Sequence, residues 1–180
     1  MPRLFVAIDL PPDVRENIAD LCYGVSGAKW VPQAQIHLTL RFIGDVDDRN
    51  YHDIVDALSR VEAMAFSFVL KGTGYFPPRR DPRVVWIGIE NADDIFALQK
   101  KIDNVLVETG VQPEERKFHP HITVARLRER ASAAQAAAFV AANTMFKSRP
   151  IDVSEFILYS SVLTRDDPVH TAEALFELRG

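Results

Sequence analysis

The chain contains almost no cysteine: Cys22 is the only one among 180 residues. One thiol cannot form an intrachain disulfide, which excludes a disulfide-stapled secreted scaffold, so we expect a reducing, cytoplasmic environment. Cys22 lies in an apolar stretch with helical spacing. We interpret it as a small core residue rather than a reactive thiol.

Long apolar runs are also missing. No stretch approaches the roughly 20 consecutive apolar residues that a membrane-spanning helix needs. The N-terminus enters a strand-like run at Leu4 without the charged segment, long apolar stretch and cleavage site of a signal peptide. We therefore expect no membrane segment and no secretion signal.

The chain has no excess of positive charge. Its formal net charge is −4, whereas proteins that bind nucleic acid through bulk electrostatics are basic. This balance is still compatible with a local basic cleft for one phosphate. No glycine-rich loop followed by Lys-Ser or Lys-Thr is present, which argues against ATP hydrolysis. With 47% hydrophobic and 26% charged residues, the composition is typical of a globular protein with a real core.

The order of hydrophobic patterns predicts an α+β protein. The expected strands are Leu4–Asp9, Gln35–Ile43, Phe66–Gly74, Val84–Glu90, Pro120–Leu127, Ile151–Leu163 and Ala172–Leu178. The expected helices begin at Pro12-Asp13, Asp47-Asp48, Asp93-Asp94 and Ser132, the last three sites acting as N-caps. Gly110 is expected to end the third helix.

The two halves of the chain repeat one order of elements: strand, helix, histidine-bearing strand, helix, strand. We expect a single domain with pseudo-repeat halves at about 1–76 and 84–163 and a C-terminal strand at 171–178. The Pro- and Arg-rich segment between the halves is too short to separate independent domains. The repeat predicts two pseudo-symmetric lobes, each a sheet with helices on its outer face.

A His-x-Thr-x pattern occurs twice, at matching places in the two halves: His37-Leu38-Thr39-Leu40 and His121-Ile122-Thr123-Val124. We expect both copies in the middle of strands, where histidine and threonine share one face and the aliphatic residues share the other. The aliphatic face should pack under helices, and the polar face should line a cleft because burying it unpaired is costly. A lone strand histidine is more often a packing residue, but two matched copies favour a catalytic pair.

The chemistry of a phosphodiester suits such a pair. Displacement at phosphorus needs a base on one side and an acid on the other, and histidine exchanges protons near neutral pH. Threonine hydroxyls can donate hydrogen bonds to the non-bridging phosphoryl oxygens. Two facing strands would place the two His-Thr pairs on opposite sides of one phosphate, as in-line attack requires.

Other segments join these motifs in resembling a known family. They are Arg3-Leu4-Phe5-Val6-Ala7-Ile8-Asp9-Leu10-Pro11, Trp30, Arg41-Phe42-Ile43-Gly44, Gly74-Tyr75-Phe76-Pro77, Arg83-Val84-Val85-Trp86 and Phe118-His119-Pro120, followed after the second motif by Ala125-Arg126. Over nearly its whole length the chain resembles the two-histidine (2H) phosphoesterase superfamily. Within it, the chain is most similar to the RNA 2′,3′-cyclic phosphodiesterases of bacteria and archaea, also called 2′–5′ RNA ligases.

The resemblance implies an active-site cleft between the lobes and hydrolysis of an RNA-terminal 2′,3′-cyclic phosphate to a 2′-phosphomonoester. The reverse reaction, 2′–5′ ligation, is implied as well. The first histidine of the family donates a proton and the second accepts one, which makes His37 the acid and His121 the base. The residues alone do not order these two roles.

Three further positions are candidates for substrate contacts. Arg126 matches a phosphate-binding arginine of the family, although strict alternation points it away from His121, so the strand must twist, bulge or end there. Phe42 matches a base-stacking position, and core packing is an equal alternative. Arg41 is expected on the His37 face and is a further phosphate candidate.

Several alternatives stay open at this point. His119 and His121 could chelate a metal, but no third ligand lies nearby, so we expect no metal and no cofactor. Arg79, Arg80 and Arg83 form either a solvated turn or an arm on RNA phosphates. The expected partner is an RNA end or a small nucleotide, bound by a monomer. Alternative functions are a phosphodiesterase for another small cyclic nucleotide and a non-catalytic RNA-end-binding module.

Overall fold

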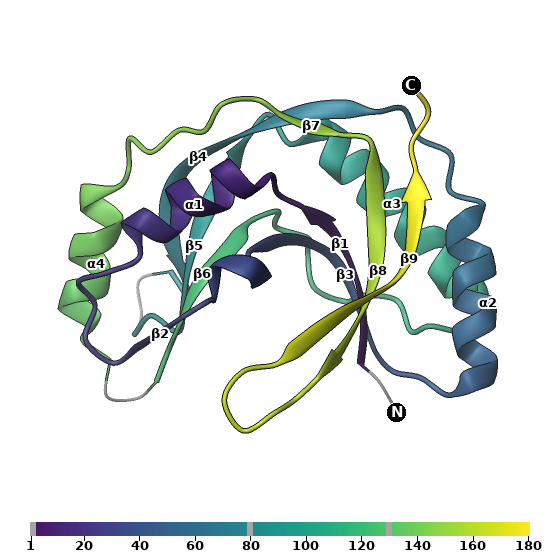
Figure 1. Cartoon of the computed structure of the whole chain (residues 1–180), viewed down its shortest axis with the longest axis horizontal. Helices are drawn as coiled ribbons and strands as arrows, with labels where there is room; N and C mark the ends of the chain where they lie inside the picture. Colours follow the sequence, from purple (N-terminus) through teal and green to yellow (C-terminus); the bar gives the residue numbers. More distant parts are fainter. Residues whose placement is uncertain (1–2, 79–80, 129–130) are drawn as a thin grey trace.

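A computed structural model describes residues 3–78, 81–128 and 131–180. Its strands form two antiparallel sheets that lie side by side, with helices around them (Figure 1). The four-stranded sheet has the order β3 (His37–Asp45), β1 (Arg3–Asp9), β8 (Glu155–Val162), β9 (Val169–Glu177). The five-stranded sheet has the order β2 (Ala28–Trp30), β6 (Ile122–Leu127), β5 (Val84–Glu90), β4 (Phe66–Phe76), β7 (Ile151–Val153). The predicted α+β class with two lobes is confirmed.

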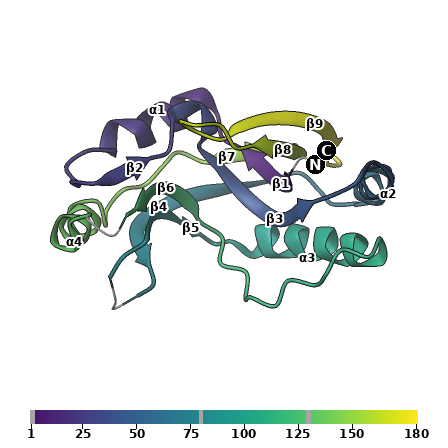
Figure 2. The same cartoon turned by 90° about the horizontal axis from the view of Figure 1, so that it is seen from below.

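The helices divide between the two sheets. α2 (Asp48–Ser59) and α3 (Asp93–Glu108) lie beside the four-stranded sheet, and α1 (Pro12–Leu21) and α4 (Ala133–Ala142) beside the five-stranded sheet (Figures 1 and 2). A short 3₁₀ turn, Gln33–Gln35, leads into β3. Among the described residues, no helix is both long and apolar enough to cross a membrane.

The lobes do not coincide with the halves of the sequence. β4 belongs to the first half but pairs with β5, and β8 belongs to the second half but pairs with β1. Each half therefore contributes its last strand to the sheet of the other half, and the short β2 of the first half also pairs with β6 of the second. The predicted strand 151–163 is in fact two strands separated by Ser154, and the chain passes from one sheet to the other there.

Two of the three predicted N-caps are present, and the third is corrected by the structure. Asp47 accepts a hydrogen bond from the Asn50 backbone, and Ser132 from the Gln135 backbone, so both are N-caps as predicted. Asp93 and Asp94 lie inside the first turn of α3, and the cap residue before them makes no side-chain bond. Their carboxylates act there on the positive end of the helix dipole rather than as caps.

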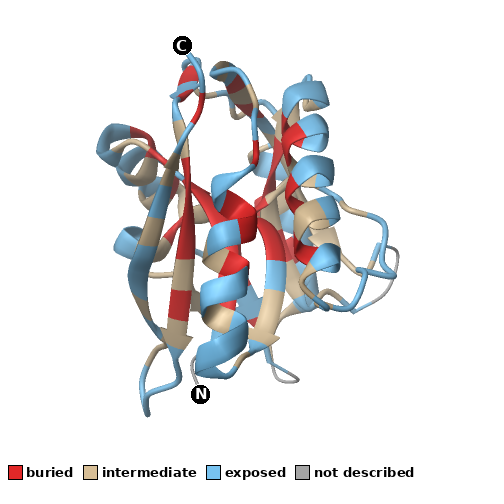
Figure 3. Cartoon of the chain, turned by 90° about the vertical axis from the view of Figure 1, so that its right-hand side faces the viewer, coloured by how far each residue is buried: buried red, intermediate tan, exposed pale blue. Residues whose placement is uncertain are grey.

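The core is formed by the aliphatic faces of the strands and the inward faces of the helices (Figure 3). Leu38, Leu40, Ile122 and Val124 are at most 2% exposed, as their alternation with His and Thr predicts. Cys22 packs at the edge of this core. Burial raises the pKa of its thiol to about 11, which disfavours the reactive thiolate.

Candidate active site

The two motif histidines stand at strand starts rather than in strand middles, which corrects the prediction. His37 is the first residue of β3, and His121 directly precedes β6. The His37 Nδ1 is 2.6 Å from the Gln35 carbonyl oxygen, and the His121 Nδ1 is 2.6 Å from the His119 carbonyl oxygen. A carbonyl only accepts, so each Nδ1 carries the proton and each Nε2 keeps its lone pair in the neutral ring. Both imidazoles are therefore held in the same tautomer by the residue two positions earlier.

The threonines share the polar face with their histidines. The Thr39 hydroxyl is 3.0 Å from the His37 Nε2. Thr123 is half-buried on β6 and pairs with Trp86 across the strands. The Thr39 hydroxyl therefore lies at the His37 Nε2, the nitrogen that the Gln35 carbonyl leaves free.

A bulge in each motif strand changes which residues follow the histidine on its face. In β3, Thr39 pairs with Ala7 and Arg41 with Val6, which leaves Leu40 without a partner. In β6, Thr123 and Ala125 pair with successive residues of β5, which leaves Val124 without a partner. One extra residue shifts the alternation by one position.

The consequence is the same in both strands. Residues four after the histidine, Arg41 and Ala125, are buried on the far face. Residues five after it, Phe42 and Arg126, return to the exposed histidine face. The bulge that the sequence required for Arg126 is present, and Phe42 is the matching position of the first motif.

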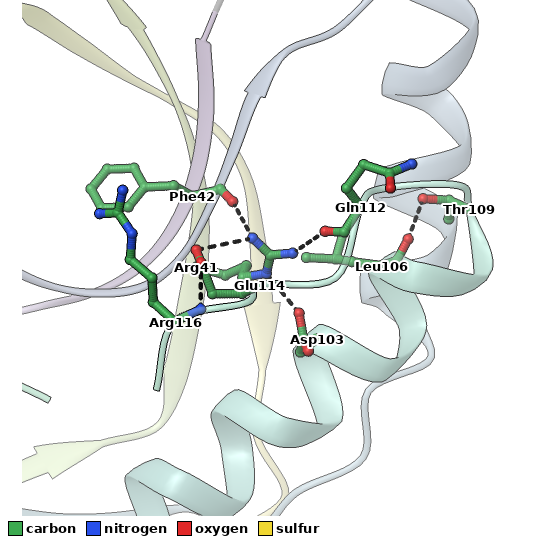
Figure 4. A network of polar contacts seen from close by, with 8 residues as sticks. All are labelled: Arg41, Phe42, Asp103, Leu106, Thr109, Gln112, Glu114 and Arg116. Carbon is green, nitrogen blue, oxygen red and sulfur yellow. Dashed lines mark hydrogen bonds and ion pairs between the residues drawn. The ribbon is translucent and has the colours of Figure 1, made fainter. Parts of the chain in front are cut away.

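Arg41 does not reach the histidine face, so its predicted contact with phosphate is wrong. Its side chain is 5% exposed and forms an ion pair with Asp103, from Nε to Oδ1 at 2.6 Å. The guanidinium also donates to the carbonyl oxygens of Phe42 and Gln112 (Figure 4). These bonds hold the guanidinium on the buried face of β3, away from the histidines.

Phe42 is 60% exposed, which rules out plain core packing. Its ring lies 6.1 Å from that of Phe5, which stacks on His37 at 5.1 Å. The rings of Tyr159 and His170 also contact Phe5. An aromatic surface therefore extends from His37 over the four-stranded sheet.

A second aromatic surface borders His121. Phe76 meets the His121 ring edge-on at 5.2 Å, and Trp86 lies 6.4 Å from it. The sequence motifs contained Phe5, Phe76 and Trp86 without showing that they touch the histidines. Tyr159 and His170 carried no signal in the sequence, because the hairpin β8–β9 reaches the site only through sheet pairing.

The environment of His37 disfavours its protonated form. Burial is the main cause and lowers its pKa below the ordinary 6.5, while the hydrogen bond to Gln35 opposes this shift. The positive charges of His170 and Arg126 lower the pKa further, and the Asp9 carboxylate raises it. Asp9 faces His37 in the paired strand, and its two oxygens accept the Tyr159 hydroxyl at 2.8 Å.

Burial also lowers the pKa of His121, and the bond to the His119 carbonyl opposes it. The charges of His119 and Arg126 add to the lowering, and no carboxylate is among the causes. Arg126 thus acts on both motif histidines. Of the two rings, His37 is the one on which a negative charge acts, that of Asp9.

The strands that carry the two motif histidines meet where the two sheets adjoin. β3 is an edge strand, and β2 pairs only with Ala125–Leu127, which leaves the start of β6 with an open edge. β3 and β6 lie against each other. Directly after β2, the Val31 N–H donates to the Val124 carbonyl at 2.9 Å, which extends the pairing of β2 with β6 by one residue. This neighbourhood agrees with the common influence of Arg126 on both imidazoles.

Of the residues that the structure describes, no three His, Cys, Asp or Glu side chains gather closely enough to hold a metal ion. His119 supplies its backbone carbonyl to His121 and has an exposed ring. Arg79 and Arg80, predicted to lie in a basic loop, are outside the described residues. Arg83 is exposed next to β5.

Comparison with known proteins places this geometry in a family. The profile described as LigT like Phosphoesterase matches residues 8–86 and again residues 87–170. The chain is 34% identical to an RNA 2′,3′-cyclic phosphodiesterase of Thermotoga maritima, over 93% of this chain and 91% of the relative. It is 31% identical to an enzyme of the same name from Archaeoglobus fulgidus, over 97% and 99% of the two chains.

Solved structures agree with these relatives. TT0787 of Thermus thermophilus superposes with a TM-score of 0.81 at 30% identity, over 99% of this chain and 98% of that one. E. coli LigT complexed with 3′-AMP superposes with a TM-score of 0.77 at 27% identity, over 99% of both chains. The matched profile, the relatives and the paired His-Thr strands together show that this chain belongs to the LigT-like phosphoesterase family and is a phosphodiesterase.

Proposed function

We propose that the protein hydrolyses a 2′,3′-cyclic phosphate, at an RNA end or on a nucleoside, to the 2′-phosphomonoester with His37 and His121 as its acid–base pair. The observation that carries the proposal is the matched state of the two imidazoles. Each has its Nδ1 fixed to the carbonyl two residues earlier, and a threonine two residues later. The names of the relatives support the substrate, and a LigT structure contains 3′-AMP.

The reaction is a displacement by water at phosphorus. His121 accepts a proton from the water through its Nε2 as the new P–O bond forms. The P–O3′ bond breaks on the opposite side, and the protonated Nε2 of His37 donates its proton to the leaving 3′ oxygen. The product keeps the phosphate on the 2′ oxygen, and one proton has passed from His37 to product while another has reached His121.

The charges around the rings support this order of roles. The Asp9 carboxylate favours the protonated form of His37 and opposes the positive charges of His170 and Arg126 there, whereas the charges acting on His121, those of His119 and Arg126, are both positive. The acid must carry a proton when the reaction starts, and the base must not. A bound anionic phosphodiester favours the protonated form of His37 further, because opposite charges raise the pKa of an imidazole.

The substrate is held by groups on both strands. Thr39, Thr123 and Arg126 donate to the non-bridging phosphoryl oxygens, where charge develops in the transition state. Phe42 stacks on the base, a contact that every base can make. The same groups catalyse 2′–5′ ligation when a 5′ hydroxyl attacks phosphorus in place of water, with the 3′ oxygen leaving as before.

We further propose that the enzyme acts in the cytoplasm as a monomer, without a metal or cofactor. Both imidazoles and Arg126 come from one chain, so no second subunit is needed to complete the site. Full activity in EDTA and a monomer mass by light scattering are the expected results.

The deciding experiment is incubation with a nucleoside 2′,3′-cyclic phosphate and identification of the product by ³¹P NMR. We expect the 2′-phosphate, and loss of turnover in His37→Ala and in His121→Ala. A 3′-phosphate product, or full activity in the double variant, contradicts the mechanism. Turnover of other small cyclic nucleotides but not of RNA ends favours the alternative substrate class. Affinity for a 2′-phosphate without turnover favours a binding module.

A further inference from the structure

Arg41 is a buried cation in a place where the proposed chemistry does not use it. Its side chain is 5% exposed, and a buried charge is tolerated only when it is paired and fully hydrogen-bonded. Asp103 supplies the close ion pair, and Glu114 lies 3.7 Å from Nη1. Two backbone carbonyls also accept hydrogen bonds from the guanidinium, those of Phe42 at 2.7 Å and of Gln112 at 2.5 Å.

These contacts join separate parts of the chain (Figure 4). Arg41 and Phe42 belong to β3, the strand that begins with His37. Asp103 lies on α3. Gln112 and Glu114 lie on the segment from Val111 to Pro120, which has no helix or strand and runs from α3 to His121.

The segment 111–120 needs such an anchor. Residues Gln112–Lys117 are all exposed, so packing holds them weakly. Phe118 rests edge-on against Phe96 at 5.6 Å nearer to its end. Arg41 is the buried side chain that binds its beginning, and without this contact the segment gains conformational freedom.

The segment also determines how His121 is oriented. The His121 Nδ1 is bound to the carbonyl of His119, which belongs to the segment itself. A shift of this backbone therefore turns the imidazole or releases its tautomer. His37 does not depend on it, because its Nδ1 is bound to Gln35 on the other side of the site.

We infer that Arg41 is a positioning residue for catalysis: it ties the segment that orients His121 to the strand that carries His37. The inference rests on the proposed function for its kinetic consequence. A displacement near 1 Å of a group in such a site costs about 100-fold in rate. The effect falls on kcat more than on KM, since Arg41 does not touch the substrate.

The test uses Arg41→Lys, which keeps the positive charge but cannot reach Asp103, Phe42 and Gln112 together. We expect kcat to fall about 10- to 100-fold, with KM changed by less than about threefold. Asp103→Asn keeps an acceptor for Nε without the charge and should give a smaller loss. Arg60→Ala is the matched control: Arg60, at the end of α2, forms an exposed ion pair with Glu108 of α3, the helix that carries Asp103, and its loss should leave kcat unchanged.

A second readout needs no substrate. In ¹⁵N-labelled protein at a pH well above 6.5, NMR distinguishes Nδ1–H from Nε2–H imidazoles. We expect His121 to lose part of its Nδ1–H population in Arg41→Lys, while His37 keeps its own. This arm remains decisive if the wild-type protein turns over no cyclic phosphate, a result that would end the proposed function alone.

Urea unfolding of each variant measures its free energy of unfolding, so that the kinetic constants are compared under conditions in which every variant is folded. Arg41→Lys with kcat within about twofold of wild type, or with an unchanged His121 tautomer, overturns the inference. So does a loss of activity that only follows the unfolded fraction, because that is the behaviour of a residue with a purely structural role.

Discussion

Replacing Gly74 by alanine should disturb the wall beside His121. Gly74 pairs with Trp86 across β4 and β5, and the indole lies flat against the glycine. A Cβ at Gly74 would stand 2.7 Å from Trp86 Cε2 and closer to the two ring atoms beyond it. The backbone at Gly74 is not left-handed, so the clash with the indole is the only obstacle to alanine.

The size of the effect follows from this distance. Carbon atoms in contact are about 3.5–4.0 Å apart, so the ring atom nearest to the new Cβ must move by more than about 1 Å. β4 closes one side, so the ring moves toward Thr123 and His121, its neighbours on the other side. Overpacking of this kind costs about 1–3 kcal/mol of unfolding free energy. We also expect kcat to fall, because the displaced indole would shift the His121 imidazole from its position.

Urea unfolding and steady-state kinetics measure both effects. Trp86→Phe removes the ring atoms that clash, so the double variant Gly74→Ala, Trp86→Phe should recover stability relative to the sum of the single changes. Additive losses in this cycle, or a Gly74→Ala protein as stable as wild type, would refute the packing of the indole on Gly74.

Three other outcomes are expected. Because burial lowers the pKa of both His37 and His121 below 6.5, and turnover needs one ring protonated, kcat/KM should peak below pH 6.5; an optimum above pH 7 contradicts this. Asp9→Asn should move the alkaline limb of that profile to lower pH, since the carboxylate raises the pKa of His37, and an unmoved limb removes Asp9 from the role. Phe42→Ala should raise KM for a nucleoside cyclic phosphate with little change in unfolding free energy, because the ring is 60% exposed; equal KM values exclude stacking.

Local sequence patterns were sufficient for most elements. β5 has the predicted bounds, Val84–Glu90, because its apolar residues and flanking turns are local signals. Asp47 and Ser132 cap their helices, since capping depends only on residues a turn away. The alternation around His37 and His121 also predicted which neighbours are buried.

Local sequence patterns do not predict which other strands a given strand pairs with. Ser154 separates β7 from β8, and these two strands join different sheets although the sequence reads as one run. The bulge at Leu40 arises where β3 meets β1 and reverses the face of Arg41. Neither result depends on propensity, because a strand's register is decided by the chain that lies beside it.

By itself, the sequence determined the chemical groups and their spacing: two imidazoles, each followed by threonine, on strands with one aliphatic face. Only the tertiary structure decided how these groups work together. Pairing between distant strands brought the aromatic rings of Phe5 and Trp86 to the histidines, and the bulge in β6 placed Arg126 on the exposed face. The same pairing turned Arg41 inward to Asp103. The physical reason is that side-chain direction follows from strand register, and register is a property of two segments rather than one.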